Sequence, residues 1–225
     1  MRGISFCVCE AVLYINLDSD KIANYNLSSD KIERKIEMQT KPYHHGNLKE
    51  EFIERGLEYI DQYGVENLSM RKLAESIGVS SAAPYAHFKN KEAFLDAITE
   101  YVNENLICAL QDAIQNCTKE QRMLIELGKR YVLFFYENPL YYQFLFSRGT
   151  VDLQNYPPFQ YYRTVAERTL KILHPKRMTK ETVRKKTITM WAIVHGLAQF
   201  ALMDGVLDKS KLEKEIESLL CAVDV

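Results

Sequence analysis

The chain of 225 residues carries 29 lysines and arginines against 30 aspartates and glutamates, a formal net charge of −1. This balance excludes a uniformly basic protein, although nucleic-acid binding requires only a local basic patch. No run approaches the roughly 18 uninterrupted apolar residues that span a bilayer. The sequence therefore indicates no membrane partner, and its length suffices for one large domain or two small ones.

The cysteine and histidine pattern argues against a metal site. The five cysteines are scattered and form no CxxC pair, which is typical of a protein in a reducing cytosol. The adjacent His44 and His45 lack further ligands at zinc-binding spacing. We expect a cytoplasmic protein with no metal and no cofactor.

The first 40 residues do not have the pattern of a folded domain. The stretch from Ile4 to Leu17 is apolar like a signal peptide, but Glu10 interrupts it and no small-residue cleavage site follows. The sequence after it is polar, mixed in charge and without clear periodicity. We interpret residues 1–40 as either a disordered extension or a mis-called start.

The first predicted helix begins near Leu48. Apolar residues recur at near-helical spacing at Leu48, Phe52, Leu57 and Ile60, and Gly64 ends the segment. Acidic side chains outnumber basic ones along it, so we expect it to pack behind the more basic segment that follows.

The segment from Leu68 to Leu95 predicts two short helices joined by a tight turn. Ser69 can cap the first, and Gly78 supplies the left-handed residue that ends it. Ser80 can cap the second within three residues. Two helices so joined cross steeply, as in a helix-turn-helix whose second helix lies in the DNA major groove. From Ser69 to Lys91 the basic residues are Arg71, Lys72, Lys89 and Lys91, against Glu75 as the single acidic one.

A long helix follows, with Asn90 as its expected cap and Lys91 as its first residue. Its apolar stripe consists of Phe94, Ile98, Tyr101, Val102, Leu106, Leu110 and Ile114. A helix of some six turns is long enough to link a DNA-reading domain to a second domain.

The remaining sequence predicts five more helices and no convincing strand. Their expected ranges are about 120–136, 141–146, a helix that follows a loop containing Pro157 and Pro158 and runs to about Leu173, 180–203, and 209–222. We therefore expect an all-α fold, with an N-terminal helix-turn-helix domain of three helices followed by a larger helical domain.

Several of these residues resemble a known family. Ile77, Gly78, Val79 and Ser80, followed by Pro84, Tyr85, His87, Phe88, Lys91, Glu92 and Leu95, look like the DNA-binding domain of TetR/AcrR-family transcriptional regulators. YHHGNLKE at residues 43–50 resembles the entry to that family's first helix, and WAIVHGLAQF at 191–200 resembles the Trp-His-Gly motif of one ligand-domain subgroup. The resemblance implies a DNA-binding domain at 41–92 and a helical ligand-binding and dimerisation domain at 93–225.

Pro84 departs from the family pattern, which has leucine or a similar residue at this position. With Ser80 as the cap, Pro84 would be the fourth helical residue and would remove the first internal hydrogen bond. Two interpretations remain open. The proline is a local quirk that the Trp-His-Gly subgroup also shows, or it re-aims the residues at 81–83 toward base edges.

The expected DNA contacts divide between the grooves and the backbone. Small side chains on the second helix allow close approach to the major groove, and an arm before residue 48 can enter the minor groove. By resemblance, Tyr85 and His87 face the DNA backbone, whereas Phe88 is expected to be a core aromatic. Lys91 opens a helix whose free amide groups attract an anion. The full set is Lys41, Tyr43, His44, Ser69, Arg71, Ser80, Ser81, Ala82, Ala83, Tyr85, His87 and Lys91.

Trp191 and His195 are four residues apart and share a helix face, and Gly196 lets another helix approach closely. One interpretation is tight packing around a buried, hydrogen-bonded histidine. The other is an apolar effector pocket with a few polar anchors. The candidate ligand residues are Tyr131, Phe134, Tyr141, Phe144, Tyr162, Trp191 and His195, with Phe135 and Phe159 as further aromatic walls of the pocket.

The resemblance implies a homodimeric repressor that binds double-stranded DNA at a palindromic operator and is released by a small apolar or aromatic effector. One short recognition helix contacts too little DNA for tight binding, so two-fold doubling is also expected on physical grounds. One alternative is an architectural DNA-binding protein without an effector. Another is an enzyme that uses His195, but no nucleophile elbow, phosphate loop or paired metal motif supports it, and we expect no enzyme.

Overall fold

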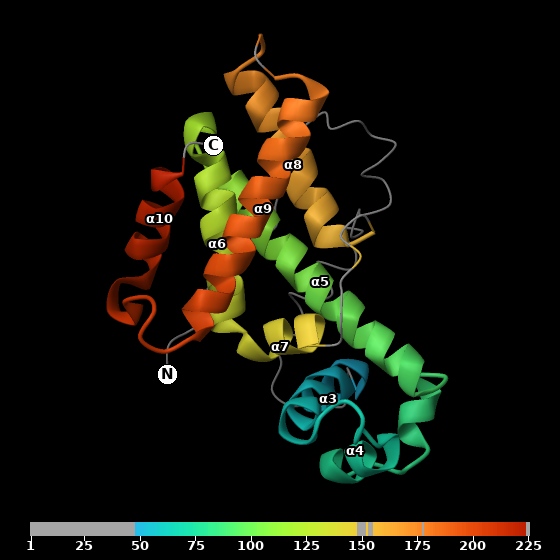
Figure 1. Cartoon of the computed structure of the whole chain (residues 1–225). Helices are drawn as coiled ribbons and strands as arrows, with labels where there is room; N and C mark the ends of the chain where they lie inside the picture. Colours follow the sequence, from blue (N-terminus) through green and yellow to red (C-terminus); the bar gives the residue numbers. More distant parts are fainter. Residues whose placement is uncertain (1–47, 148–151, 153–154, 177, 224–225) are drawn as a thin grey trace. The chain divides into compact units, whose positions relative to one another are not determined.

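Helices make up the regular structure of this protein in the computed structural model, which describes residues 48–147, 152, 155–176 and 178–223 (Figure 1). Within these ranges there are eight α-helices, three short 3₁₀ helices and no strand. The expectation of an all-α fold is therefore confirmed. The expectations for residues 1–40, and for Lys41, Tyr43 and His44, lie outside the described residues.

The first two helices end where the sequence predicts. Helix α3 (Leu48–Tyr63) is followed by Gly64 with φ of 79°, and α4 (Met70–Ile77) is followed by Gly78 with φ of 82°. Glycine adopts such left-handed conformations at little cost, which is why both helices stop there. At the other end of α4, the Ser69 side chain accepts a backbone N–H of the first turn and acts as the predicted cap.

The second helix of the predicted pair is a 3₁₀ helix, η2 (Ala83–Ala86), and it begins later than expected. An α-helix capped by Ser80 would need the residue at position 84 to donate to the Ser80 carbonyl, and Pro84 has no N–H. The Ser80 carbonyl instead accepts from the residue three positions on, at 2.9 Å, and Tyr85 N donates to Ala82 O at 3.1 Å. The prediction that Ser80 caps this helix is therefore wrong, and Pro84 lies near the helix start, where proline is tolerated.

Helix α5 (Lys91–Gln115) carries the predicted apolar stripe and packs against α3. The Asn90 side chain accepts the Ala93 N–H at 2.8 Å and caps the helix as expected. Its stripe is buried from Phe94 to Ile114, apart from Tyr101, which is partly exposed. A Cβ at Gly56 of α3 would lie 2.8 Å from Cε1 of Phe94, so the two helices are in direct contact there.

The C-terminal helices are η3 (Glu120–Arg122), α6 (Met123–Glu137), α7 (Pro139–Ser147), α8 (Pro157–Leu173), α9 (Lys180–Leu202), η4 (Lys209–Lys211) and α10 (Leu212–Ala222). Helix α6 packs against α5, α9 and α10 (Figure 1). The expected loop containing Pro157 and Pro158 is wrong, because these prolines form the first turn of α8. Proline fits there because the first N–H groups of a helix have no internal partner. No described helix is long and apolar enough to cross a membrane.

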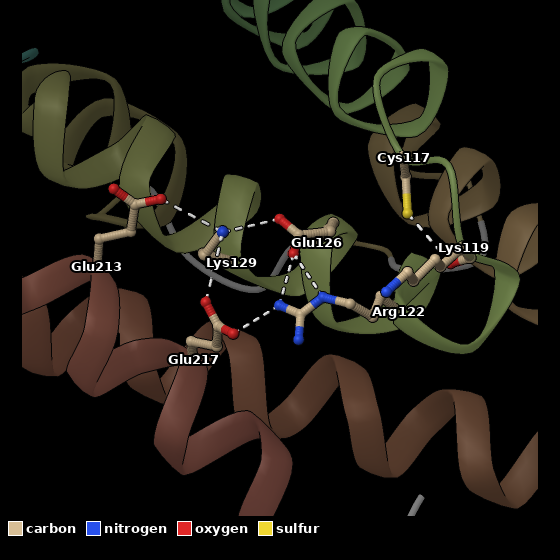
Figure 2. A network of polar contacts seen from close by, with 7 residues as sticks. All are labelled: Cys117, Lys119, Arg122, Glu126, Lys129, Glu213 and Glu217. Atoms are coloured by element: carbon tan, nitrogen blue, oxygen red, sulfur yellow. Dashed lines mark hydrogen bonds and ion pairs between the residues drawn. The ribbon is translucent and has the colours of Figure 1, made fainter.

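An ion-pair network joins α6 and the residue before it to α10 (Figure 2). Lys129 Nζ lies 2.7 Å from Glu126 Oε2 and 3.3 Å from Glu213 Oε1, and Arg122 pairs with Glu126 and with Glu217. Burial alone would lower the pKa of Lys129, but its hydrogen bonds to the two carboxylates raise it. The lysine therefore stays charged, and the network helps to set where α10 packs on α6.

Candidate functional site

The first candidate site is an exposed surface on the turn after α4 and on η2, which we call the reading surface and define as residues 80–82 and 85–87. All six residues are exposed, and Tyr85 is 56 % exposed although it is a large aromatic. Pro84 and Phe88 are buried between and beside them. The turn is thus held from inside while its small and polar side chains face outward. Ala83, which was expected at this surface, is only partly exposed.

Phe88 attaches the reading surface to α3 and α5. Its ring makes edge contacts with Phe52 of α3 and with Phe94 of α5, at centroid distances of 6.2 and 4.8 Å. Edge-to-face packing of this kind is favourable, and Phe88 is only 3 % exposed. Its predicted place in the core is confirmed, in contrast to the outward-facing Tyr85.

Two of the cations near the reading surface, Lys91 and Arg71, have partners within the chain. Lys91 Nζ donates to the Glu66 carbonyl at 3.2 Å, and Arg71 Nε lies 3.0 Å from Glu75 Oε1. The ammonium group retains further donors for a phosphate. The Arg71 pair is highly exposed, and such pairs contribute about 0–1 kcal/mol. Both side chains can therefore turn to an anion at little cost.

The second candidate site is a group of aromatic rings around Trp191 of α9, the Trp191 cluster. The indole contacts the rings of Tyr131, Phe159 and Tyr162 at 4.9, 5.0 and 5.3 Å, and that of Tyr156 at 6.1 Å. The interplanar angles are 63–75°, so the contacts are edge-to-face. Residues of α6, α8 and α9, together with the chain before α8, thus meet at one indole.

His195 extends the Trp191 cluster by one helical turn. Its Nδ1 lies 3.1 Å from the Tyr131 hydroxyl, its ring stacks on Tyr142 at 5.6 Å, and Phe146 meets it edge-on at 4.5 Å. Burial lowers the pKa of His195, so the ring is neutral at neutral pH. A neutral imidazole offers one donor and one acceptor, which gives this aromatic region a polar group.

Four of the seven predicted ligand residues come together in this way, namely Tyr131, Tyr162, Trp191 and His195. Phe134 and Tyr141 lie in a neighbouring group, in which Tyr141 contacts Phe134 at 5.9 Å and Tyr101 of α5 at 6.3 Å. Phe144 is buried in α7.

Sequence reasoning missed three members of the site, Tyr142, Phe146 and Tyr156. The first two are four residues apart on α7, so their shared helix face was a usable signal. Tyr156 precedes the first proline of α8 and lies outside the helix. Helical periodicity therefore could not indicate where its side chain points.

Gly196 was expected to let another helix approach closely, but no described part of this chain does so. A Cβ at Gly196 would meet no described atom within 4 Å, whereas one at Gly128 of α6 would lie 2.9 Å from Val194 Cγ1. Among the described residues, the close approach of α9 to another helix is therefore made at Gly128. At Gly196, the space that a Cβ would occupy is not filled by any described atom.

Residues 50–98 match the family described as Bacterial regulatory proteins, tetR family. This stretch of the chain belongs to the TetR family. The match covers the reading surface and the buried residues Pro84 and Phe88 that hold it. Because the match ends before Trp191, membership of the Trp-His-Gly subgroup stays a prediction.

Curated relatives match over a short part of the chain. The tetracycline repressor protein class C of Escherichia coli is 48 % identical over 52 residues, which are 23 % of this chain and 24 % of that protein. The chain thus matches about a quarter of the length of this curated relative.

Solved structures match over a larger part of the chain. A protein of unknown function from Rhodococcus sp. RHA1 has a TM-score of 0.61 at 25 % identity, covering 80 % of this chain and 95 % of that one. AibR, solved in complex with isovaleryl coenzyme A and operator DNA, has a TM-score of 0.59 at 17 % identity, covering 76 % and 96 %. The likeness to AibR concerns the fold alone.

Proposed function

We propose that this TetR-family protein is a DNA-binding transcriptional repressor, which binds a palindromic operator as a homodimer and is released by a small apolar or aromatic effector. The observation that carries the proposal is the reading surface. It presents Tyr85 and small side chains outward on a turn that Pro84 and Phe88 anchor.

The chemistry of the reading surface fits DNA. Ser81 and Ala82 are small and exposed, so a major-groove wall can come close, with the alanine methyl available to thymine and the serine hydroxyl to base edges. Tyr85 offers a hydroxyl to a backbone phosphate, and Lys91 adds a cation at the start of α5. Phosphate contacts position such a surface, while base contacts supply sequence preference.

We place a second copy of the chain against the outer face of α9. Ile188, Ala192, Gly196 and Phe200 follow one another at intervals of four residues, and the two large side chains are 46 % and 45 % exposed. An apolar stripe of this kind is unusual on a surface that faces only water. The small residues at its centre allow the backbone of an identical helix to approach, and the same stripe on both copies gives a two-fold interface. Two reading surfaces then meet two operator half-sites.

The Trp191 cluster is the place proposed for the effector. Its walls are aromatic, and His195 with four tyrosines supplies the few polar groups that orient a ligand in such sites. A route to the DNA-binding unit runs through Tyr101, whose ring contacts Tyr141 and whose hydroxyl bonds Glu54 of α3. An effector that shifts α7 would therefore act on α3 through packed side chains.

Selection of bound duplexes from a random DNA pool tests the proposal. The expected result is a palindromic sequence that two copies of the full chain bind, with affinity falling steeply as salt is raised. Absence of any enriched sequence, or enrichment of an asymmetric site that one copy binds, would contradict it. Operator binding that no small molecule releases would favour an architectural protein instead.

A further inference from the structure

Two buried hydroxyl groups in the Trp191 cluster have no hydrogen-bond partner among the described residues. They belong to Tyr156, which is 5 % exposed, and to Tyr162, which is fully buried. Buried hydroxyls are nearly always paired, because leaving one unpaired costs stability. These two groups are therefore candidates for a function that requires free donors inside the protein.

The two unpaired hydroxyls lie near other phenol groups. Tyr131, Tyr156 and Tyr162 all contact the indole of Trp191, and Tyr142 stacks on His195. Burial raises the pKa of Tyr131 well above its ordinary value, and the neighbouring phenols of Tyr156, Tyr142 and Tyr162 raise it further. Tyr131 itself reaches His195. The cluster thus combines an apolar surface of rings with a local concentration of neutral hydrogen-bonding groups.

No described cation or carboxylate acts on this group. The tyrosine pKa values are raised by burial, and that of Tyr131 additionally by its tyrosine neighbours, while the pKa of His195 is lowered by burial. Within the described chain, an ionised ligand here would lose its water without gaining a counter-charge, which is strongly unfavourable. A neutral acceptor loses far less on burial and regains it through hydrogen bonds from the phenols.

We propose that the hydroxyls of Tyr156 and Tyr162 are the polar anchors of the effector site, and that they select an uncharged molecule with a flat apolar skeleton and a carbonyl acceptor. Ketones, esters, amides and lactones on an aromatic ring are of this class. The corresponding free carboxylates are excluded by their charge. This inference rests on the proposed function and specifies the chemistry of its effector.

Three probes of equal ring size separate the alternatives: acetophenone, benzoate and ethylbenzene. Binding to the full chain is followed by ligand-observed NMR and by the fluorescence of Trp191, the single tryptophan. The expected order is acetophenone, then ethylbenzene, then benzoate. Acetophenone should bind about five- to tenfold more tightly than ethylbenzene for each hydroxyl engaged, the usual value of one neutral hydrogen bond.

Substitutions that remove single hydroxyls test the anchors. Tyr156→Phe and Tyr162→Phe keep the rings against Trp191, so the affinity for ethylbenzene should hardly change. The ratio of acetophenone affinity to ethylbenzene affinity should fall about five- to tenfold in each variant. Tyr161→Phe is the matched control, because Tyr161 is the neighbour of Tyr162 on α8 but lies near Cys108 of α5. It should leave the order of the probes unchanged.

The outcome separates this inference from the proposed function. Tightest binding of benzoate, binding of none of the probes, or an unchanged acetophenone advantage in both phenylalanine variants would overturn the anchor assignment. Operator binding by the unliganded wild-type chain is measured in parallel. If an operator is found, such a failure concerns only the effector chemistry, whereas failure to find an operator counts against the proposed function itself. Circular dichroism is used to check that each variant is folded. Removal of one unpaired hydroxyl should not prevent folding.

Discussion

The hydroxyl of Tyr101 on α5 donates a hydrogen bond of 3.3 Å to Oε1 of Glu54 on α3. The same tyrosine ring meets Tyr141 of α7 edge-on, so one side chain touches both α3 and α7. Burial raises the pKa of Tyr101, which keeps the hydroxyl protonated as a donor. Under the proposed function, a movement of α7 would reach α3 through this side chain.

Removal of this hydroxyl should weaken the connection while keeping the ring. Tyr101→Phe is expected to lower the free energy of unfolding by about 0.5–1 kcal/mol, the value of one partly exposed hydrogen bond. Glu54→Gln retains an acceptor at the same position and should cost less. Denaturant titration of the three proteins checks this order, and a Tyr101→Phe protein as stable as wild type would show that the bond contributes nothing.

Charge and hydroxyl contacts to DNA should be separable at Lys91 and Tyr85. Lys91→Gln keeps a donor for the Glu66 carbonyl but removes the charge, so operator affinity should fall and the salt slope should flatten by about one charge-equivalent per subunit. Tyr85→Phe should weaken binding without altering that slope by more than a small amount. Gel-shift titrations at several salt concentrations measure both effects.

Matched controls for these variants are Lys185→Gln on α9 and Tyr63→Phe at the end of α3, because both side chains are exposed and lie outside the reading surface. Equal losses in the controls and in the Lys91 and Tyr85 variants would contradict the assignment.

A charge in the middle of the α9 stripe should separate the two copies. Ala192 is exposed and lies between Ile188 and Gly196, so Ala192→Glu would bury an unpaired carboxylate in the proposed interface, at a cost of several kcal/mol. Sedimentation should then give the 26.2 kDa monomer, with the helical circular dichroism retained. Lys176→Glu changes an exposed charge outside the stripe and should leave the dimer intact. A wild-type protein that is already monomeric would refute the interface.

Two glycine-to-alanine changes should have opposite effects on the stability of the subunit. At Gly56 the new methyl group would collide with the fully buried ring of Phe94, and overpacking of this kind costs about 1–3 kcal/mol. At Gly196 the space within the chain is open, so alanine should stabilise the helix by about 0.5–1 kcal/mol. Thermal unfolding at low protein concentration shows whether each variant is less or more stable than wild type. If Gly56→Ala is as stable as Gly196→Ala, α3 can shift to accommodate the added methyl group without cost.

The buried tyrosines should make the protein sensitive to alkali. Burial raises the pKa values of Tyr131, Tyr156 and Tyr162 above the ordinary value of 10.0. Their contribution to stability is therefore complete below pH 10 and is lost as the pH rises toward their values in the folded state, because the unfolded chain ionises first. Denaturant midpoints measured from neutral pH to about pH 11 should fall only above pH 10. The fall should be shallower in Tyr162→Phe, and a fall of the same steepness would contradict the burial of this hydroxyl.

The sequence by itself determined where several helices of this protein begin and end. Ser69 and Asn90 cap α4 and α5, and Gly78 ends α4, as expected from residue type. Such boundaries depend on hydrogen bonds and backbone conformations within a few residues, so local sequence carries the information. The apolar stripe of α5 was equally readable, because a buried helix face repeats with the period of the helix.

The tertiary structure alone decided which side chains meet. Periodicity indicates that Trp191 faces inward, but it does not say that Tyr131 of α6, Tyr142 of α7 and Tyr162 of α8 arrive at the same place. These partners come from separate helices, and their meeting depends on how the helices pack. Close approaches such as that of Val194 to Gly128 decide this packing. The pairing of Tyr131 with His195, and the lack of a described partner for the hydroxyls of Tyr156 and Tyr162, follow from that packing and could not be derived from the order of residues.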